Sequence, residues 1–520
     1  MSDSITPLSA LESLLLYAVR VGLLPPEDVN YARNALLDAF GLSAPTDGYG
    51  LDDAKEIPLS EALDALNAYA AERGLIGDSP SARERFGVKL MGLLTPSPEA
   101  FRNRFETIER ISGIDSACAW FNQLCVTNGY INEIAIAKNE RYFAPSPYGA
   151  LEITINLSKP EKDPRDIAAL ADIDSARETE YPACMLCLEN EGYAGRPGFP
   201  ARQTLRTLPI ELDGERWRFQ FSPYRYFPEH CIVFAETHSP MRIDVSTFRK
   251  LFDFLDRFPH YVIGSNADLP IVGGSVLNHN HFQGGKYIFP MEKADVFARA
   301  THPMYPRVRV SMLRWPMTAL RLTGEDRQSI VGMAELIRTA WNKYSDPSLG
   351  VLARTNSILH NTVTPIARRL KNEYALDLVL RNNRATQEHP LGLFHPHSEL
   401  HHIKKENIGL IEVMGMFILP GRLMTELNAL RFALTDGKCF ARHEADDPLA
   451  KHDEWISSLV KRYGCDQPSD SAERILRDAL AEKCVRVLED AGVFKQDGSG
   501  RNGFVRFLES VGFVTAQSKS

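Results

Sequence analysis

Residues 273–285 read GGSVLNHNHFQGG, a run that places two histidines and a glutamine between two pairs of glycines. If its centre is a β-strand, the two-residue period turns His279, His281 and Gln283 to one face. Two imidazoles and an amide then share one site. The glycine pairs let backbone approach a bulky anion such as a phosphate, where a Cβ would obstruct it. The alternative is a histidine-bearing strand edge beside two turns.

A sheet is predicted around this stretch. From Leu151 to Leu157, apolar and polar residues alternate as in a half-buried strand. Further strands are predicted at 217–221, 231–236, 261–264, 286–289, 307–314 and 375–380, and helices at 245–258 and 327–344. Because long crossover helices do not alternate regularly with these strands, the order predicts an α+β fold with mostly antiparallel sheet.

Both ends of the chain are predicted to be helical. Ser9, three residues before Glu12, forms a capping-box pattern that opens the first helix. Prolines and a serine mark three further helix starts near Pro26, Pro58 and Ser81. From Glu412 onward the pattern is again helical, and it ends with a helix over 472–491.

Length and composition exclude several classes of protein. The chain has 520 residues, enough for two or three units of roughly 150 residues, and 44% apolar with 24% charged residues is an ordinary globular composition. A formal charge of −8 argues against nucleic acid or an anionic membrane as partner, so positive charge for an anionic ligand must be local. The longest apolar run, 408–420, is shorter than the roughly 20 residues of a membrane span. No secretory signal is indicated, and we expect a cytoplasmic protein.

One pair of cysteines has a spacing that suggests chemistry. Cys184 and Cys187 have the gap of a zinc knuckle, whereas eight cysteines in the whole chain are too few for a disulfide scaffold. A tetrahedral site needs two more ligands, for which His238 and His279 are the first candidates and His230 the reserve. The alternative is two buried thiols that bind no metal.

Together these motifs resemble the galactose-1-phosphate uridylyltransferases, most closely the second, mainly bacterial class of that family. The resemblance extends over most of the chain and rests on four stretches, at 151–164, 184–196, 279–285 and 394–423. It implies an enzyme that transfers UMP from UDP-glucose to galactose 1-phosphate by ping-pong kinetics through a uridylyl-histidine. It also makes a homodimer plausible.

The resemblance implies a fold as well. The core would be two histidine-triad-like, mostly antiparallel sheet halves, with helical additions at both ends. The implied divisions are a helical N-terminal region at 1–140, a first half with the nucleophile at 141–300, a second half at 301–425 and a helical C-terminal region at 426–520.

The family signature, His-Pro-His-Gly-Gln, assigns roles to the central stretch. Its second histidine is uridylylated, which places the nucleophile at His281 and the phosphate-contacting glutamine at Gln283, with Asn280 and Phe282 replacing Pro and Gly. A glutamine can hydrogen-bond phosphate oxygens without protonating a leaving group or activating water. The same match implies a structural metal, with zinc as the expected ion and no organic cofactor, held by Cys184, Cys187, His238 and His279.

Further residues are implied contacts for the two phosphorylated substrates. Those that resemble the family's nucleotide, phosphate and sugar contacts are Lys159 with Lys162, Asn266, Ser275 and Glu412. Ser275 lies one residue further from His281 than the family's serine does. Local positive charge recurs at Arg368, Arg369, Arg381, Arg384, Lys404 and Lys405. Arginine forks suit phosphate oxygens, and the alternative is a solvated basic face.

A second histidine pair, His395-Pro396-His397, resembles the signature superficially. It lacks the flanking glycines and the following glutamine, so we reject it as the nucleophile. With His401 and His402 nearby, a second metal site and a solvated histidine-rich loop are both open.

Two rival functions are considered. One is a hydrolase of nucleotide conjugates from the histidine-triad superfamily, whose hydrolytic members carry a further histidine at the position of Gln283. The other is a non-catalytic protein that binds zinc and nucleic acid, against which the net charge argues. The sequence leaves open whether the acceptor is galactose 1-phosphate, its N-acetylated relative or another hexose 1-phosphate, and whether UTP can be the donor.

Overall fold

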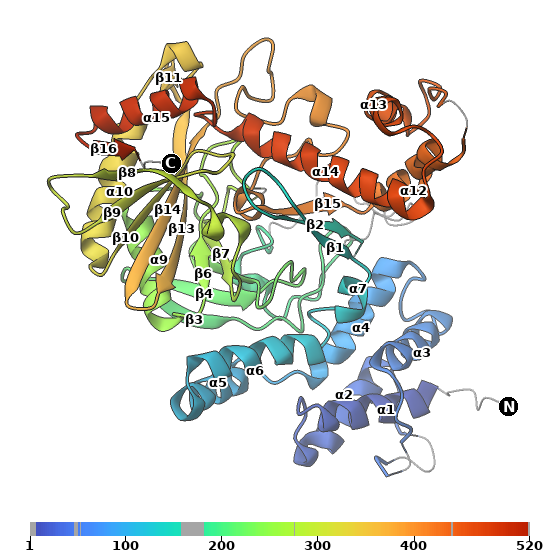
Figure 1. Cartoon of the computed structure of the whole chain (residues 1–520). Helices are drawn as coiled ribbons and strands as arrows, with labels where there is room; N and C mark the ends of the chain where they lie inside the picture. The colour runs from blue at the N-terminus through green and yellow to red at the C-terminus, as the bar shows by residue number, and fades with distance from the viewer. Residues whose placement is uncertain are drawn as a thin grey trace.

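The computed structural model describes residues 7–45, 50–52, 54–157, 181–274, 276–437 and 440–517. Its centre is an 11-stranded sheet of order β16-β8-β9-β10-β14-β13-β6-β7-β5-β4-β3 (Figure 1). The strands are β3 (Leu208–Leu212), β4 (Glu215–Phe221), β5 (Cys231–Ala235), β6 (Val262–Gly264), β7 (His281–Gly285), β8 (Val296–Thr301), β9 (Arg309–Leu313), β10 (Ala319–Gly324), β13 (Asn361–Leu370), β14 (Glu373–Asn382) and β16 (Val514–Gln517).

The large sheet is built from two halves with the same strand order. The first half runs β3-β4-β5-β7-β6, and α9 (Val245–Arg257) lies between its third and fourth strands along the chain. The second half runs β8-β9-β10-β14-β13, with α10 (Arg327–Trp341) in the same position. β6 pairs antiparallel with β13 and joins the halves into one sheet. The predicted α+β class with mostly antiparallel sheet is confirmed, while the domain boundaries stay a prediction.

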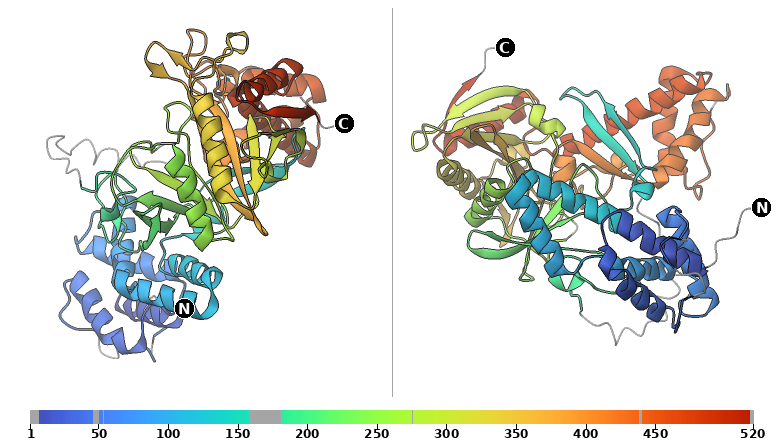
Figure 2. Two further views of the ribbon diagram at one scale, coloured as in Figure 1. Left: turned by 90° about the vertical axis from the view of Figure 1, so that its left-hand side faces the viewer. Right: turned by 90° about the horizontal axis from the view of Figure 1, so that it is seen from below.

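The two faces of the sheet have different neighbours. Both α9 and α10 cover one face, as the left view of Figure 2 shows in green and yellow. Phe282 of β7 faces this side and stacks on Trp217 at a centroid distance of 4.7 Å. Because side chains alternate along a strand, His281 and Gln283 face the opposite side. That side faces a second core, which includes a smaller sheet and the helices between residues 410 and 491.

The smaller sheet has the order β1-β2-β15, made of β1 (Glu140–Ala144), β2 (Leu151–Asn156) and β15 (Met416–Pro420). β15 runs parallel to β2, so the expectation of helix from Glu412 onward is wrong at these residues. A short, continuously apolar run cannot be assigned to helix or strand by periodicity alone, and here pairing with β2 decides. The C-terminal helices are α11 (Leu410–Val413), α12 (Arg422–Thr435), α13 (Asp453–Tyr463), α14 (Ser469–Ala491) and α15 (Gly498–Ser510).

The N-terminal region is helical as predicted, but the predicted capping box of its first helix does not form. The helices are α1 (Pro7–Arg20), α2 (Val29–Ala39), α3 (Leu59–Glu72), α4 (Pro80–Leu94), α5 (Pro98–Ser112), α6 (Ile114–Thr127) and α7 (Glu133–Ile136). Helix α1 begins at Pro7, a residue favoured at the first helical position, so Ser9 lies inside it. Glu12 pairs with Arg33 of α2 across 2.7 Å instead of closing a capping box. No helix in the described part of the chain is long and apolar enough to cross a bilayer.

The strand predicted at 286–289 is also wrong, because the strand lies earlier, at β7. The chain leaves the sheet after Gly285, and Tyr287 and Phe289 then pack around Phe227. Aromatic residues favour strands in general, but here they fill the core between the two sheets.

A buried ion cluster ties the strands of the second half together. Asp377 of β14 accepts hydrogen bonds from Arg321 at 2.7 Å and from Arg368 at 2.9 Å. Although burial alone would raise the pKa of Asp377, the two guanidinium groups hold it below its usual value.

The Asp377→Ala variant is expected to be less stable by about 3–5 kcal/mol, because it leaves two largely buried guanidinium groups without their shared carboxylate. Thermal unfolding followed by circular dichroism measures this loss. The matched control is Glu373→Ala, which removes the surface partner of Arg309 and should change the midpoint little. Equal midpoints for the two variants would show that the buried cluster does not stabilise the sheet.

Candidate active site

His281 opens strand β7, and its imidazole is held in one tautomer. Its Nδ1 lies 2.8 Å from the carbonyl oxygen of His279, to which Nδ1–H donates. Only 4% of the residue is exposed, and burial lowers the pKa of His281 to about 4, so the ring is neutral at pH 7. A neutral ring that donates through Nδ1 carries its lone pair on Nε2, and no described residue hydrogen-bonds to that atom. His281 therefore presents a neutral nitrogen with an available lone pair.

Gln283 lies two residues along the same face and is half-buried. Its Oε1 is 3.2 Å from Nε2 of His230, a buried residue just before β5. In the described part of the chain, no residue hydrogen-bonds to the amide nitrogen of Gln283. That nitrogen is a free donor on the face that also presents Nε2 of His281.

The glycines around this strand are required by close packing. A Cβ at Gly284 would lie 2.3 Å from the carbonyl oxygen of Val262, and one at Gly274 would lie 2.6 Å from Nδ2 of Asn266. Oδ1 of Asn266 accepts a hydrogen bond from the backbone N–H of Leu410 at 2.8 Å. Asn266 thereby connects the loop at Gly274 to the start of α11 at Leu410.

Four predicted metal ligands converge beside His281. Their four ligand atoms, from Cys184, Cys187, His238 and His279, all lie within 4.8 Å of one another. Sγ of Cys184 is 3.2 Å from Nδ1 of His279, and Sγ of Cys187 is 3.0 Å from Nδ1 of His238. The reserve candidate, His230, lies outside this cluster.

The surroundings of the cluster suit a bound zinc ion. Nε2–H of His279 donates to the carbonyl oxygen of Ala235 at 2.8 Å, which leaves the Nδ1 lone pair directed at the sulfurs. The side-chain nitrogen of Asn190 donates to the carbonyl oxygens of Cys184 and Cys187, both at 2.8 Å, and fixes the turn between them. Two sulfurs and two imidazole nitrogens are the donor set of a closed structural zinc site.

Two family models match the sequence: the N-terminal domain of galactose-1-phosphate uridyl transferase matches residues 25–240, and the C-terminal domain matches residues 254–436. The chain belongs to this family. Galactose-1-phosphate uridylyltransferase of Caldanaerobacter subterraneus subsp. tengcongensis is 46% identical over 97% of this chain and 98% of its own length. That of Bacillus subtilis is 44% identical over 98% of both chains. The family and the class of enzyme predicted from the sequence are thereby confirmed.

Among solved structures, yeast Ap4A phosphorylase Apa2 matches 63% of this chain and 88% of its own, at 13% identity. Its TM-score of 0.30 is too low to define a shared fold.

Several predicted substrate contacts cluster around residues 404–412. Nη2 of Arg381 donates to the carbonyl oxygen of Ile408 at 3.0 Å, and Nζ of Lys404 lies 3.0 Å from Oε1 of Glu412. Arg381 is buried, and its Nε atom has no hydrogen-bond partner among the described residues. Burial lowers the pKa of Arg381 to about 10, so its guanidinium is still charged at pH 7. Asn266 borders the same segment, as its bond to Leu410 shows.

Other predicted contacts have different surroundings. Lys159, Lys162 and Ser275 lie outside the described residues. Lys405 is exposed. Arg368 shares Asp377 with Arg321 and lies 3.5 Å from Glu292, so it belongs to the buried ion cluster of the second half.

The second histidine group does not form one site. His402 pairs with His452, Nδ1 to Nδ1 at 2.7 Å, whereas His401 donates from Nε2 to the carbonyl oxygen of Pro396 at 2.9 Å. Ligand atoms of His397, Glu399 and Asp490 lie within 4.8 Å of one another. The structure thus groups His397 with Glu399 and Asp490, and gives His401 and His402 separate partners.

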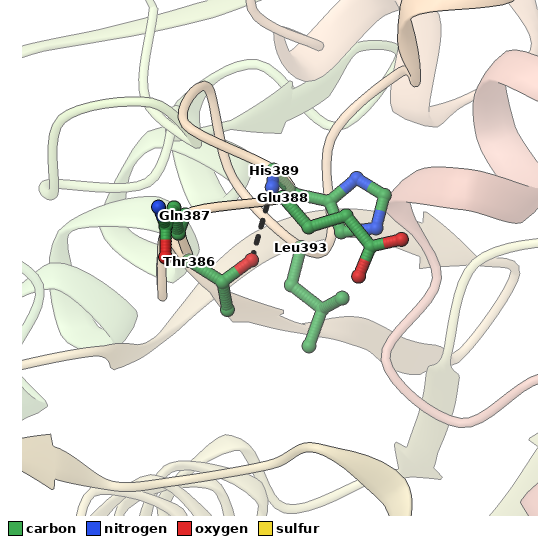
Figure 3. A pocket seen from close by; sticks show the side chains of 5 residues that line it. All are labelled: Thr386, Gln387, Glu388, His389 and Leu393. Carbon is green, nitrogen blue, oxygen red and sulfur yellow. Dashed lines mark hydrogen bonds between the residues drawn. The ribbon is translucent and has the colours of Figure 1, made fainter.

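A cavity of about 530 Å³ opens beside that group, in the loop after β14. Its lining residues are Thr386, Gln387, Glu388, His389 and Leu393 (Figure 3). The ring of His389 stacks on that of His397 at 4.2 Å. Because neither His281 nor Gln283 lines this cavity, it does not belong to the candidate active site.

Proposed function

We propose that this chain transfers UMP from UDP-glucose to galactose 1-phosphate, giving UDP-galactose and glucose 1-phosphate. The observation that carries the proposal is the imidazole of His281, whose Nδ1–H is held by the carbonyl oxygen of His279 so that Nε2 keeps its lone pair. Family membership supports the choice of substrates.

The reaction proceeds in two displacements at one phosphorus atom. Nε2 of His281 attacks the α-phosphorus of UDP-glucose, an N–P bond forms, and the bond to the bridging oxygen breaks to release glucose 1-phosphate. A phosphate oxygen of galactose 1-phosphate then attacks the same phosphorus and displaces His281. The bond from Nδ1–H to the His279 carbonyl stabilises the positive charge that the ring carries while it is uridylylated.

Gln283 supports transfer over hydrolysis. Its amide nitrogen donates to a non-bridging phosphate oxygen, where charge builds up in each displacement. An amide can neither protonate a leaving group nor activate water at neutral pH, so the uridylyl-enzyme persists until a sugar phosphate binds. This disfavours the rival nucleotide-conjugate hydrolase.

We propose that Cys184, Cys187, His238 and His279 hold zinc. When bound, the ion supplies structural stability by linking the 184–187 turn to the ends of β5 and β7. His279 then fixes the carbonyl oxygen to which His281 donates. The chemistry itself is done by the side chains of His281 and Gln283.

The phosphates and the sugar are proposed to bind along the 404–412 segment. Arg381 and Lys404 supply positive charge, Asn266 supplies an amide, and Glu412 accepts hydrogen bonds from sugar hydroxyls. Lys159 and Ser275 remain proposed contacts on the family resemblance alone, and Lys405 remains one because of its place in the local run of positive charge. We also propose a cytoplasmic enzyme that acts as a homodimer.

The Lys404→Met variant should raise the KM for at least one of the two sugar substrates about tenfold, because a charged hydrogen bond to phosphate contributes about 1.5–3 kcal/mol. Initial rates measured while each substrate is varied in turn test this. The control is Lys343→Met, an exposed lysine beyond the end of α10 on the opposite face. If Lys404→Met changes neither KM more than the control does, the residue serves only its pair with Glu412.

Initial-rate kinetics with a panel of hexose 1-phosphates tests the function as a whole. Parallel double-reciprocal lines for UDP-glucose and galactose 1-phosphate support the ping-pong transferase. Continuous release of glucose 1-phosphate and UMP without any acceptor would instead identify a hydrolase. A higher kcat/KM for an N-acetylated or other hexose 1-phosphate would change the assigned acceptor.

A further inference from the structure

We propose that His230 is a positioning residue for the proposed transfer reaction: it fixes the orientation of the Gln283 amide so that its NH2 group faces the phosphate. The inference rests on the proposed roles of His281 and Gln283. It extends them to a side chain that touches neither substrate nor the reacting atoms.

The location of His230 makes Gln283 its partner. His230 directly precedes β5, which pairs with β7, and Ile232 is the residue opposite Gln283. The side chains of His230 and Ile232 share a face, so the imidazole of His230 lies diagonally across from the Gln283 amide. Nε2 of His230 and Oε1 of Gln283 are 3.2 Å apart.

The imidazole of His230 has little freedom to turn. It is 2% exposed, and the rings of Tyr226 and Phe227 pack against it at centroid distances of 5.4 and 4.5 Å. The backbone on either side is tied as well, since the carbonyl oxygen of His230 accepts from Ser222 at 2.7 Å. A ring fixed in this way can impose its own hydrogen-bonding direction on a softer neighbour such as a glutamine amide.

The protonation of the ring selects which end of the amide it binds. Burial lowers the pKa of His230 to about 4, so the ring carries one N–H at neutral pH. Nδ1 is buried and has no partner within the described residues. A buried N–H without an acceptor is rarer and more costly than an unused lone pair, so the proton resides on Nε2. Nε2–H then donates to Oε1 of Gln283, and the amide NH2 points away from His230.

This orientation matters because a glutamine amide has two ends of opposite character. If the amide turned over, its carbonyl oxygen would face the phosphate oxygens, and the interaction would become repulsive. His230 thus makes a donor out of a side chain that could equally be an acceptor.

The test is a double-mutant cycle on the rate of enzyme uridylylation. His230→Phe keeps an aromatic ring between Tyr226 and Phe227 but removes the donor, and Gln283→Met removes the amide. Single-turnover reactions with UDP-glucose give the rate for wild type, both single variants and the double variant. We expect His230→Phe to slow uridylylation at least tenfold in the wild-type background and less than twofold in the Gln283→Met background.

Two further variants separate positioning from packing. His230→Gln places an N–H donor at a reach similar to that of Nε2 and should restore most of the lost rate. His260→Phe, a half-buried histidine beside Tyr261 and outside the site, is the matched control and should leave the rate unchanged. If His230→Phe slows both backgrounds by the same factor, or if His230→Gln is as slow as His230→Phe, the proposal is wrong.

A readout independent of turnover keeps the proposal separate from the proposed function. Nitrogen NMR of the enzyme with 15N-labelled histidine should show His230 protonated at Nε2 and bare at Nδ1. The Nε2–H signal should shift in the Gln283→Met variant. A wild-type enzyme that forms no covalent adduct would overturn the proposed function alone, whereas a ring protonated at Nδ1 would overturn the role of His230.

Discussion

The His281→Asn variant is expected to keep its fold and to lose UMP transfer by at least about 10⁴-fold, the scale seen when a catalytic nucleophile is removed. Asparagine can still donate from its side-chain nitrogen to the His279 carbonyl, so the local backbone is preserved. It has no nitrogen lone pair with which to attack phosphorus. Coupled assays of glucose 1-phosphate release and circular dichroism measure the two parts of this expectation.

His397→Asn is the matched control for that variant. His397 ends the His-Pro-His sequence in the loop after β14. Its Nδ1 lies 3.6 Å from Oδ2 of Asp490, and it has no hydrogen bond or ion pair with the described residues of the proposed active site. We expect it to retain transfer activity. Activity that survives in His281→Asn and disappears in His397→Asn would reverse the assignment of the nucleophile.

Cys184→Ser is expected to lower both the zinc content and the thermal stability of the protein. A serine hydroxyl is a poor zinc ligand, and a structural zinc site contributes its binding energy directly to folding. The variant should purify with less than one zinc per chain and unfold at a lower temperature, as a wild-type sample treated with a chelator should. Elemental analysis and thermal unfolding measure both effects.

Cys465→Ser is the control, because this half-exposed cysteine lies outside the metal cluster. It should keep both the zinc content and the unfolding temperature. A wild-type enzyme that is free of metal and fully active would contradict the proposed zinc site.

The central stretch could be understood from the sequence because it combines local and long-range signals. The two-residue period of a strand is enough to place His281 and Gln283 on one face, whereas His279 lies just before β7 and not within it. The Cys-x-x-Cys spacing and the family resemblance then selected His238 over His230, and the structure brings the selected four residues together.

The partners of several other side chains could not be predicted, because they lie far away in the sequence. Arg368 appeared to be a free positive charge because its partner Asp377 lies on the neighbouring strand, and only the register of β13 and β14 brings them together. Glu12 was expected to close a capping box with Ser9, yet its side chain pairs with Arg33 of the next helix. The contact of His230 with Gln283 likewise could not be predicted from the sequence, because it depends on the pairing of β5 with β7.

Covalent trapping tests the central claim most directly. The wild-type enzyme is incubated without acceptor in UDP-glucose that is radiolabelled at the α-phosphate, and is then denatured and digested. We predict about one label per active chain, in an acid-labile and base-stable linkage on the peptide that contains His281. If galactose 1-phosphate is added to the labelled enzyme before denaturation, the label should leave the protein as UDP-galactose. Absence of bound label, or label on the peptide that contains His397, would contradict the account.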